Sequence, residues 1–282
     1  MAAVSQVDRE RARAELLRAV EGDESQVDLA RAALWIAAES VPQLDVDRYL
    51  EQIDALASSI RPEVALAGSP DAAARALLRA LCEDHGFSGN QDDYYDPRNS
   101  YLSDVLDRRT GLPITLSIVL IAVGRRLGVP LQGVGLPGHF IARTPGEPPV
   151  LLDAFTGLVL RPGDCQDLVR QAVGPAAELL PEHLRPAAPR TILVRVLTNL
   201  KHVHARGGDL EAALSCSDRI LALAPDAAPE LRDRALLYAQ LECFGAALAD
   251  LERYVALVND PNVARRAEPA LAELRERARQ VH

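Results

Sequence analysis

Residues 135–155 of this chain, GLPGHFIARTPGEPPVLLDAF, predict a β-hairpin. Two short apolar runs, HFIAR and VLLDAF, flank residues 144–149, whose sequence TPGEPP favours a turn. If positions whose numbers sum to 292 face each other, His139 and Asp153 become cross-strand neighbours with Cβ atoms about 5 Å apart. The hairpin therefore predicts a histidine and a carboxylate in contact.

A site for covalent catalysis combines a nucleophile, a base and a group that orients the base, and such a pair would supply the last two. The carboxylate of Asp153 would fix the tautomer of the His139 imidazole, and a thiol or hydroxyl at a helix N-terminus would complete the site. The apolar residues 114–123, preceded by Gly111-Leu112-Pro113 and followed by the stop residue Gly128, predict a suitable helix. No cysteine stands at its start.

The order of this helix, then VPLQGVGLPGHF, then LLDAF resembles the core of the transglutaminase-like superfamily, a papain-related fold. Residues 94–140 resemble its bacterial SirB-type branch more closely, and members of that branch carry tetratricopeptide-like repeats behind the core. The resemblance implies a helix-borne Cys in a Gly-x-Cys step, followed by a strand His and a strand Asp. The corresponding step is Gly111-Leu112-Pro113, so Pro113 occupies the expected place of the nucleophile.

The predicted fold class is α+β, in four regions. A helical bundle over residues 1–85 packs on a transglutaminase-like core over residues 86–175, which holds a small antiparallel sheet. Helical spacing of apolar residues between Val46 and Ile60, and the cap Ser69-Pro70, indicate the helices of the first region. A proline-rich connector, 176–190, leads to tetratricopeptide-like helix pairs in residues 191–282.

The helix pairs are indicated by an internal match at an offset of 34 residues, the tetratricopeptide period. It pairs Ala213 with Ala247 and Leu214 with Leu248. Two such units are few for a solenoid, so we expect them to stack on either the tail, residues 264–280, or the core. The repeats either form a peptide-binding groove or complete the protein's own core.

Residues 92–109, DDYYDPRNSYLSDVLDRR, offer a second set of candidates. In one interpretation Tyr95, Asp96, Arg98 and Asn99 line a binding cleft beside His139, where the arginine could hold a carboxylate. In the other, Arg98 pairs internally with Asp96 or Asp104.

Composition narrows the class of protein. A formal charge of −9 opposes general nucleic-acid binding, which needs a basic surface. No apolar run approaches the roughly 20 residues of a membrane span, and the N-terminus lacks a signal-peptide core, so we expect a cytoplasmic protein. The four cysteines have no metal or redox spacing, and burial is expected for Cys82, Cys216 and Cys243, with Cys165 near a helix start. We expect neither a metal nor a cofactor.

Three functions are compatible with these features. The absent thiol favours a non-catalytic protein that binds a protein or peptide partner or acts as a scaffold. A hydrolase or acyltransferase could instead use His139 and Asp153 with a hydroxyl nucleophile, Thr115 or Ser117, or with a relocated nucleophile. His139 could also serve as a general base on water or on a partner's own nucleophile.

Overall fold

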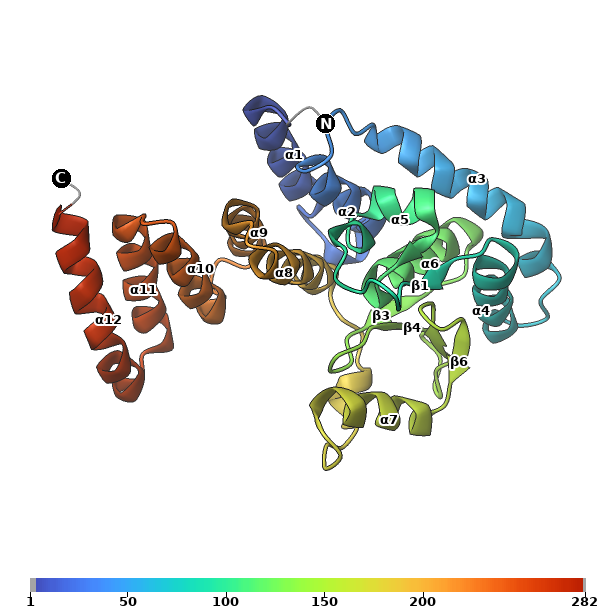
Figure 1. Cartoon of the computed structure of the whole chain (residues 1–282). Helices are drawn as coiled ribbons and strands as arrows, with labels where there is room; N and C mark the ends of the chain where they lie inside the picture. The colour runs from blue at the N-terminus through green and yellow to red at the C-terminus, as the bar shows by residue number, and fades with distance from the viewer. Residues whose placement is uncertain (1–3, 281–282) are drawn as a thin grey trace. The chain divides into compact units, whose positions relative to one another are not determined.

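The computed structural model describes residues 4–280 and divides into two compact units, one ending at Val196 and the other beginning at Leu197 (Figure 1). Helix α8 (Pro189–Arg206) contains the division. The first unit combines helices with small sheets, and the second is helical, which confirms the predicted α+β class.

The first four helices of this unit begin at residues whose side chains cap them. The hydroxyl of Ser69 accepts the N–H of Ala72, and Pro70 is the first residue of its helix, as the sequence predicts. The helices are α1 (Gln6–Ala19), α2 (Leu29–Ala38), α3 (Val46–Ala65), α4 (Pro70–Arg79), the π-helical turn η2 (Ala80–Asp84), α5 (Leu102–Arg108), α6 (Pro113–Leu127) and α7 (Pro162–Val173).

Helix α6 is the centre of this unit. Every residue from Pro113 to Leu120 is buried, because the helix is apolar on all sides and other elements surround it. It contacts α2, α3, α4, α5 and the first two strands of the main sheet. Gly128 ends it in the left-handed conformation (φ +72°), which confirms the predicted stop.

Two sheets accompany the helices. Strands β1 (Ser88–Gly89) and β2 (Thr110–Gly111) pair in parallel at the start of α6. Four antiparallel strands form the main sheet in chain order: β3 (Gln132–Val134), β4 (Ile141–Arg143), β5 (Leu151–Asp153) and β6 (Leu158–Leu160).

The hairpin of β4 and β5 has a different register from the predicted one. Ala142 faces Leu152 and Arg143 faces Leu151, so paired positions sum to 294 rather than 292. The cause is the turn, which Thr144 and Val150 close: the Thr144 N–H donates to the Val150 carbonyl, and the Val150 N–H donates to the Thr144 hydroxyl. A shift of two positions keeps each side chain on its face of the sheet, so His139 and Asp153 become diagonal neighbours.

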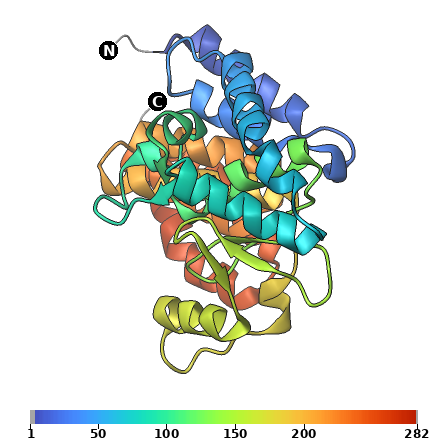
Figure 2. The same ribbon diagram turned by 90° about the vertical axis from the view of Figure 1, so that its right-hand side faces the viewer.

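The main sheet lies between α6 and α7 (Figures 1 and 2). On the α7 side, Val134, Ile141 and Leu151 form an apolar cluster with Cys165 of α7. A small layered core thus holds the hairpin rigidly.

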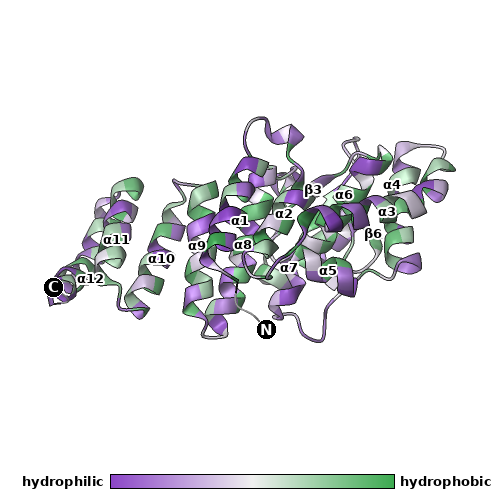
Figure 3. Ribbon diagram, turned by 90° about the horizontal axis from the view of Figure 1, so that it is seen from above, coloured by the Kyte–Doolittle hydropathy of each residue, from purple (hydrophilic) through white to green (hydrophobic). Residues whose placement is uncertain are grey.

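The second unit consists of helix pairs. Besides the end of α8 it contains α9 (Leu210–Leu223), α10 (Ala228–Gln240), α11 (Phe244–Val258) and α12 (Pro261–Gln280). The 34-residue match relates α9 to α11. Helix α12 packs on α11, which places the C-terminal tail against the repeats, one of the two predicted alternatives. Figure 3 shows both polar and apolar residues along α11 and α12, as expected for helices with one buried face.

Candidate functional site

His139 and Asp153 lie together at one end of the main sheet. Nε2 of His139 is 3.0 Å from Oδ2 of Asp153, the proximity that the sequence predicts. Nε2 is buried and makes no hydrogen bond of acceptable angle to any described residue, so the two groups lie close together without a directed hydrogen bond between them. The His139 side chain is only 12% exposed.

Asp153 is held by its own turn. Its Oδ1 accepts the N–H of Phe155 at 3.0 Å, and its Oδ2 accepts the hydroxyl of Thr156 at 2.8 Å. The side chain is almost fully buried. Both carboxylate oxygens therefore have donors of their own, and the acid is fixed in position whether or not the imidazole is protonated.

The loop that carries His139 is fixed from a distant helix. Arg195 of α8 donates to the carbonyl of Leu136 at 3.0 Å and to that of His139 at 2.7 Å, and its guanidinium stacks over the Phe140 ring. Burial lowers the pKa of Arg195. Nothing in the sequence marks this contact, because 56 residues separate Arg195 from His139.

We expect Arg195→Met to loosen this loop. It removes two charge-assisted hydrogen bonds and takes the Arg195 donor from the His139 carbonyl, whereas the Leu136 carbonyl keeps the N–H of His139. A loss of about 2–3 kcal/mol in unfolding free energy is expected. Hydrogen exchange of the amides of residues 135–140 will rise, whereas Arg161→Met, at an exposed position away from the loop, will leave it unchanged. Equal exchange in both variants would show that Arg195 does not stabilise the loop.

One aromatic ring contacts the imidazole, and two more extend from that ring in a row. Phe155 meets His139 edge to face with ring centroids 5.9 Å apart, and Tyr94 meets Phe155 at 6.4 Å. Tyr95 stacks edge to face on Tyr94 at 5.6 Å and is 55% exposed. Of these three rings, the sequence predicts a role only for that of Tyr95. Tyr94 could have been found because it is the neighbour of Tyr95, and Phe155 because it ends the DAF sequence that contains Asp153.

The remaining cleft candidates contact their own loop. Arg98 pairs with Asp96 at 2.8 Å, one of the two partners considered for it, and Arg108 lies 3.4 Å from the same carboxylate. Burial acts to raise the pKa of Asp96, but the bonds and charges of Arg98 and Arg108 outweigh it and lower the pKa. Buried Asn99 donates to the carbonyls of Asp93 and Tyr94. Of the four candidates, Tyr95 and Arg98 present exposed side chains.

The start of α6 carries no reactive side chain. Pro113 is its first residue and is buried. The hydroxyl of Thr115 is buried, donates to the carbonyls of Asn99 and Leu112, and accepts the N–H of Leu112. Ser117 is buried as well, with no hydrogen-bond partner among the described residues.

The cysteines only partly follow the prediction. Cys165 and Cys216 are buried, but Cys243 is exposed and Cys82 is half-buried. The prediction of burial was wrong for Cys243 because this residue precedes α11, in the exposed turn between two helices. Cys82 lies beside the site, with Sγ 3.9 Å from the carbonyl oxygen of Ala154. Burial, with the charge of Asp153, raises the pKa of Cys82 to about 11.

Two further properties bear on the class of protein. No helix between residues 4 and 280 combines the length and the apolar character needed to cross a bilayer. Nor do the described residues contain a group of three or more His, Cys, Asp or Glu side chains suited to a metal ion.

Comparison with known proteins agrees with a core followed by helix pairs. The model of the transglutaminase-like superfamily matches residues 47–198, and a tetratricopeptide repeat model matches residues 200–272. A UPF0162 protein of Xylella fastidiosa is 42% identical over 83% of this chain and 85% of its own length. A UPF0162 protein of Pseudomonas aeruginosa is 39% identical (87% and 90%), and Protein SirB1 of Salmonella typhimurium is 30% identical (73% and 77%). The chain therefore belongs to the SirB-type branch of the transglutaminase-like superfamily and carries tetratricopeptide repeats behind its core.

Proposed function

We propose that this protein is a non-catalytic transglutaminase-like protein that works by binding a protein or peptide partner. The observation that carries the proposal is buried Pro113 at the first position of α6. Proline has neither a nucleophilic side chain nor an N–H that could help to bind an oxyanion. The positive end of the helix dipole, which would favour a thiolate, therefore has no thiol to act on.

The hydroxyls further along α6 do not replace the thiol. Thr115 and Ser117 are both buried, and the three hydrogen bonds of the Thr115 hydroxyl hold the turn that begins the helix. A nucleophile has to reach the substrate and the base together. The burial of both hydroxyls supports a structural role for them.

The nearby thiols are also poorly suited. Burial raises the pKa of both Cys82 and Cys165 to about 11, with neighbouring carboxylates adding to the effect. A thiol with that pKa is ionised to about 0.01% at pH 7, and only the thiolate attacks. His139 and Asp153 are then a pair that the fold retains without a nucleophile. A partner would contact the exposed side chains of Tyr95 and Arg98 near this pair.

Turnover and thiol labelling test the absence of catalysis. We expect the full-length protein to show no amine incorporation into a glutamine substrate and no cleavage of fluorogenic peptides beyond the level of His139→Ala. Iodoacetamide at pH 7 will label exposed Cys243 first, with Cys82 and Cys165 slower by about a hundredfold. Turnover lost in Cys82→Ser or Cys165→Ala would reveal a relocated nucleophile, and turnover lost in Thr115→Val or Ser117→Ala a hydroxyl one.

A further inference from the structure

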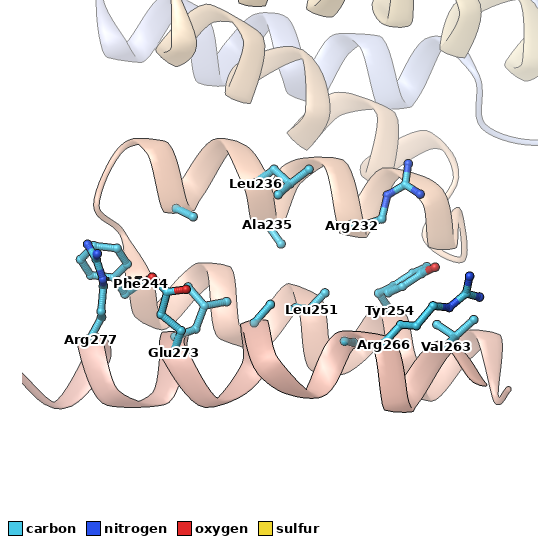
Figure 4. A pocket seen from close by; sticks show the side chains of 14 residues that line it. Arg232, Ala235, Leu236, Phe244, Leu251, Tyr254, Val263, Arg266, Glu273 and Arg277 are labelled. Atoms are coloured by element: carbon cyan, nitrogen blue, oxygen red, sulfur yellow. Dashed lines mark ion pairs between the residues drawn. The ribbon is translucent and has the colours of Figure 1, made fainter. Parts of the chain in front are cut away.

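A groove of about 600 Å³ runs through the C-terminal unit, with α10 and α12 as its walls and α11 as its floor (Figure 4). Its apolar lining consists of Ala235, Leu236, Ala239, Phe244, Leu251, Val263, Ala267, Ala270 and Leu274. The remaining lining residues are Tyr254, Glu273 and three arginines. None of these lining residues belongs to the His139 site, and binding of a ligand in the groove requires no catalytic residue.

The apolar lining is incompletely covered. Leu251 and Leu274 are buried, but Phe244 and Tyr254 of the same cluster are only partly buried. Leu236, on the α10 wall, is 59% exposed. An accessible apolar trough of this kind gains free energy when an apolar ligand surface covers it.

The charges on the groove are predominantly positive. Arg232 and Arg266 lie at one end, near Tyr254, and Arg277 lies at the other end, where its guanidinium stacks over Phe244 (Figure 4). Glu273, the single acidic residue of the lining, is 3.4 Å from Arg277. Arg232 pairs with Asp233, whereas Arg266 has no carboxylate partner among the described residues. In a chain of formal charge −9, this groove is complementary to an acidic ligand.

The lining also selects the conformation of the ligand. It contains no Asn, Gln, Ser or Thr side chain that could bond a peptide backbone. Along the apolar part of the lining, an extended segment would bury backbone N–H and C=O groups without partners, whereas a helix satisfies its own. Arg266 and Arg277 are eleven residues apart on α12, a rise of about 16 Å, or three helical turns.

We propose that this groove binds an amphipathic α-helix of a partner protein, about three turns long, with an apolar face and carboxylates near both ends. The inference rests on the proposed binding function and specifies its partner. Apolar side chains of the ligand cover the trough, and its terminal carboxylates meet Arg266 at one end and Arg277 at the other. This is recognition of a helix in a groove between helices.

The test measures binding of synthetic helices to the full-length protein by fluorescence anisotropy. The probe is a capped 15-residue peptide with a leucine face and glutamates eleven positions apart. One control replaces both glutamates with lysines, and another places a proline at the centre to break the helix. We expect the lysine peptide to bind at least about tenfold more weakly, the proline peptide to lose binding, and added salt to weaken the glutamate peptide.

Variants locate the site. Arg266→Glu combined with Arg277→Glu is expected to reverse the preference, so that the lysine peptide binds more tightly than the glutamate peptide; a misfolded protein would bind neither. Arg265→Glu, at the exposed neighbouring position outside the groove, leaves the preference unchanged. Ala270→Trp fills the groove and abolishes binding, whereas Ala272→Trp, exposed on the same helix but absent from the lining, does not.

Three results would overturn the proposal. The first is equal affinity for the glutamate and lysine peptides, or no binding at millimolar peptide. The second is undiminished binding of the proline peptide, which would indicate an extended ligand. The third is a dimer in light scattering that Ala270→Trp dissociates, which would make a second copy of this chain the occupant. None of these binding results would change the predicted absence of turnover. Observed turnover would likewise leave the conclusions from the binding experiments unchanged.

Discussion

Lys201→Met is expected to lower the unfolding free energy of the C-terminal unit by about 3–5 kcal/mol, because it leaves a buried carboxylate without its cation. Lys201 is buried and lies 2.7 Å from Glu230 and 3.1 Å from Asp233. Glu230 is itself buried, and its second oxygen accepts the hydroxyl of Ser217. This network joins α8 to α9 and α10.

Urea unfolding followed by circular dichroism, with hydrogen exchange in α9 and α10, measures the effect. The double variant Lys201→Met with Glu230→Met removes both charges and is expected to regain most of the loss, because two apolar side chains can replace a buried ion pair. Arg275→Met, which breaks the exposed pair with Glu252, is the control, with a loss below about 1 kcal/mol. If the single and double variants were equally unstable, packing rather than charge would be responsible.

Ile118→Ala is expected to cost the N-terminal unit about 2–5 kcal/mol, since it opens a cavity in a helix that is covered on all sides. Ile118 is fully buried in α6. Ile121, on the same helix, is only partly buried and lines a surface pocket, so Ile121→Ala is expected to cost about 1 kcal/mol.

The fluorescence of Trp35 reports this difference, because Trp35 is the single tryptophan and belongs to α2, which packs on α6. The midpoint of urea unfolding will fall much further for Ile118→Ala than for Ile121→Ala, with the slope of the transition unchanged. Equal shifts would contradict the central position of α6.

The core of the chain, which contains His139 and Asp153, illustrates what local sequence could predict about the site. The contact of His139 with Asp153 was predicted correctly although the register was not. Strand side chains alternate with a period of two, so an error of two positions preserves the face. The absence of a nucleophile at Pro113 was equally visible, since it depends on one residue at the start of one helix.

Contacts between distant segments could not be predicted in this way. Arg195 reaches the His139 loop across 56 residues, and the hydroxyl of Thr115 bonds to Asn99, which is 16 residues away. Neither residue is distinguished by its neighbours in the sequence. Their partners are decided by the packing of helices, which depends on many side chains at once.

By itself, the sequence determined the α+β class, the helical repeats and the pairing of His139 with Asp153, because hydrophobic period, caps and turn residues act between near neighbours. Only the tertiary structure decided that Thr115 and Ser117 are buried, that Cys243 is exposed, and that α10, α11 and α12 leave an apolar groove with arginines at its ends. Burial and grooves depend on which helices lie side by side, and that arrangement is a property of the folded chain as a whole.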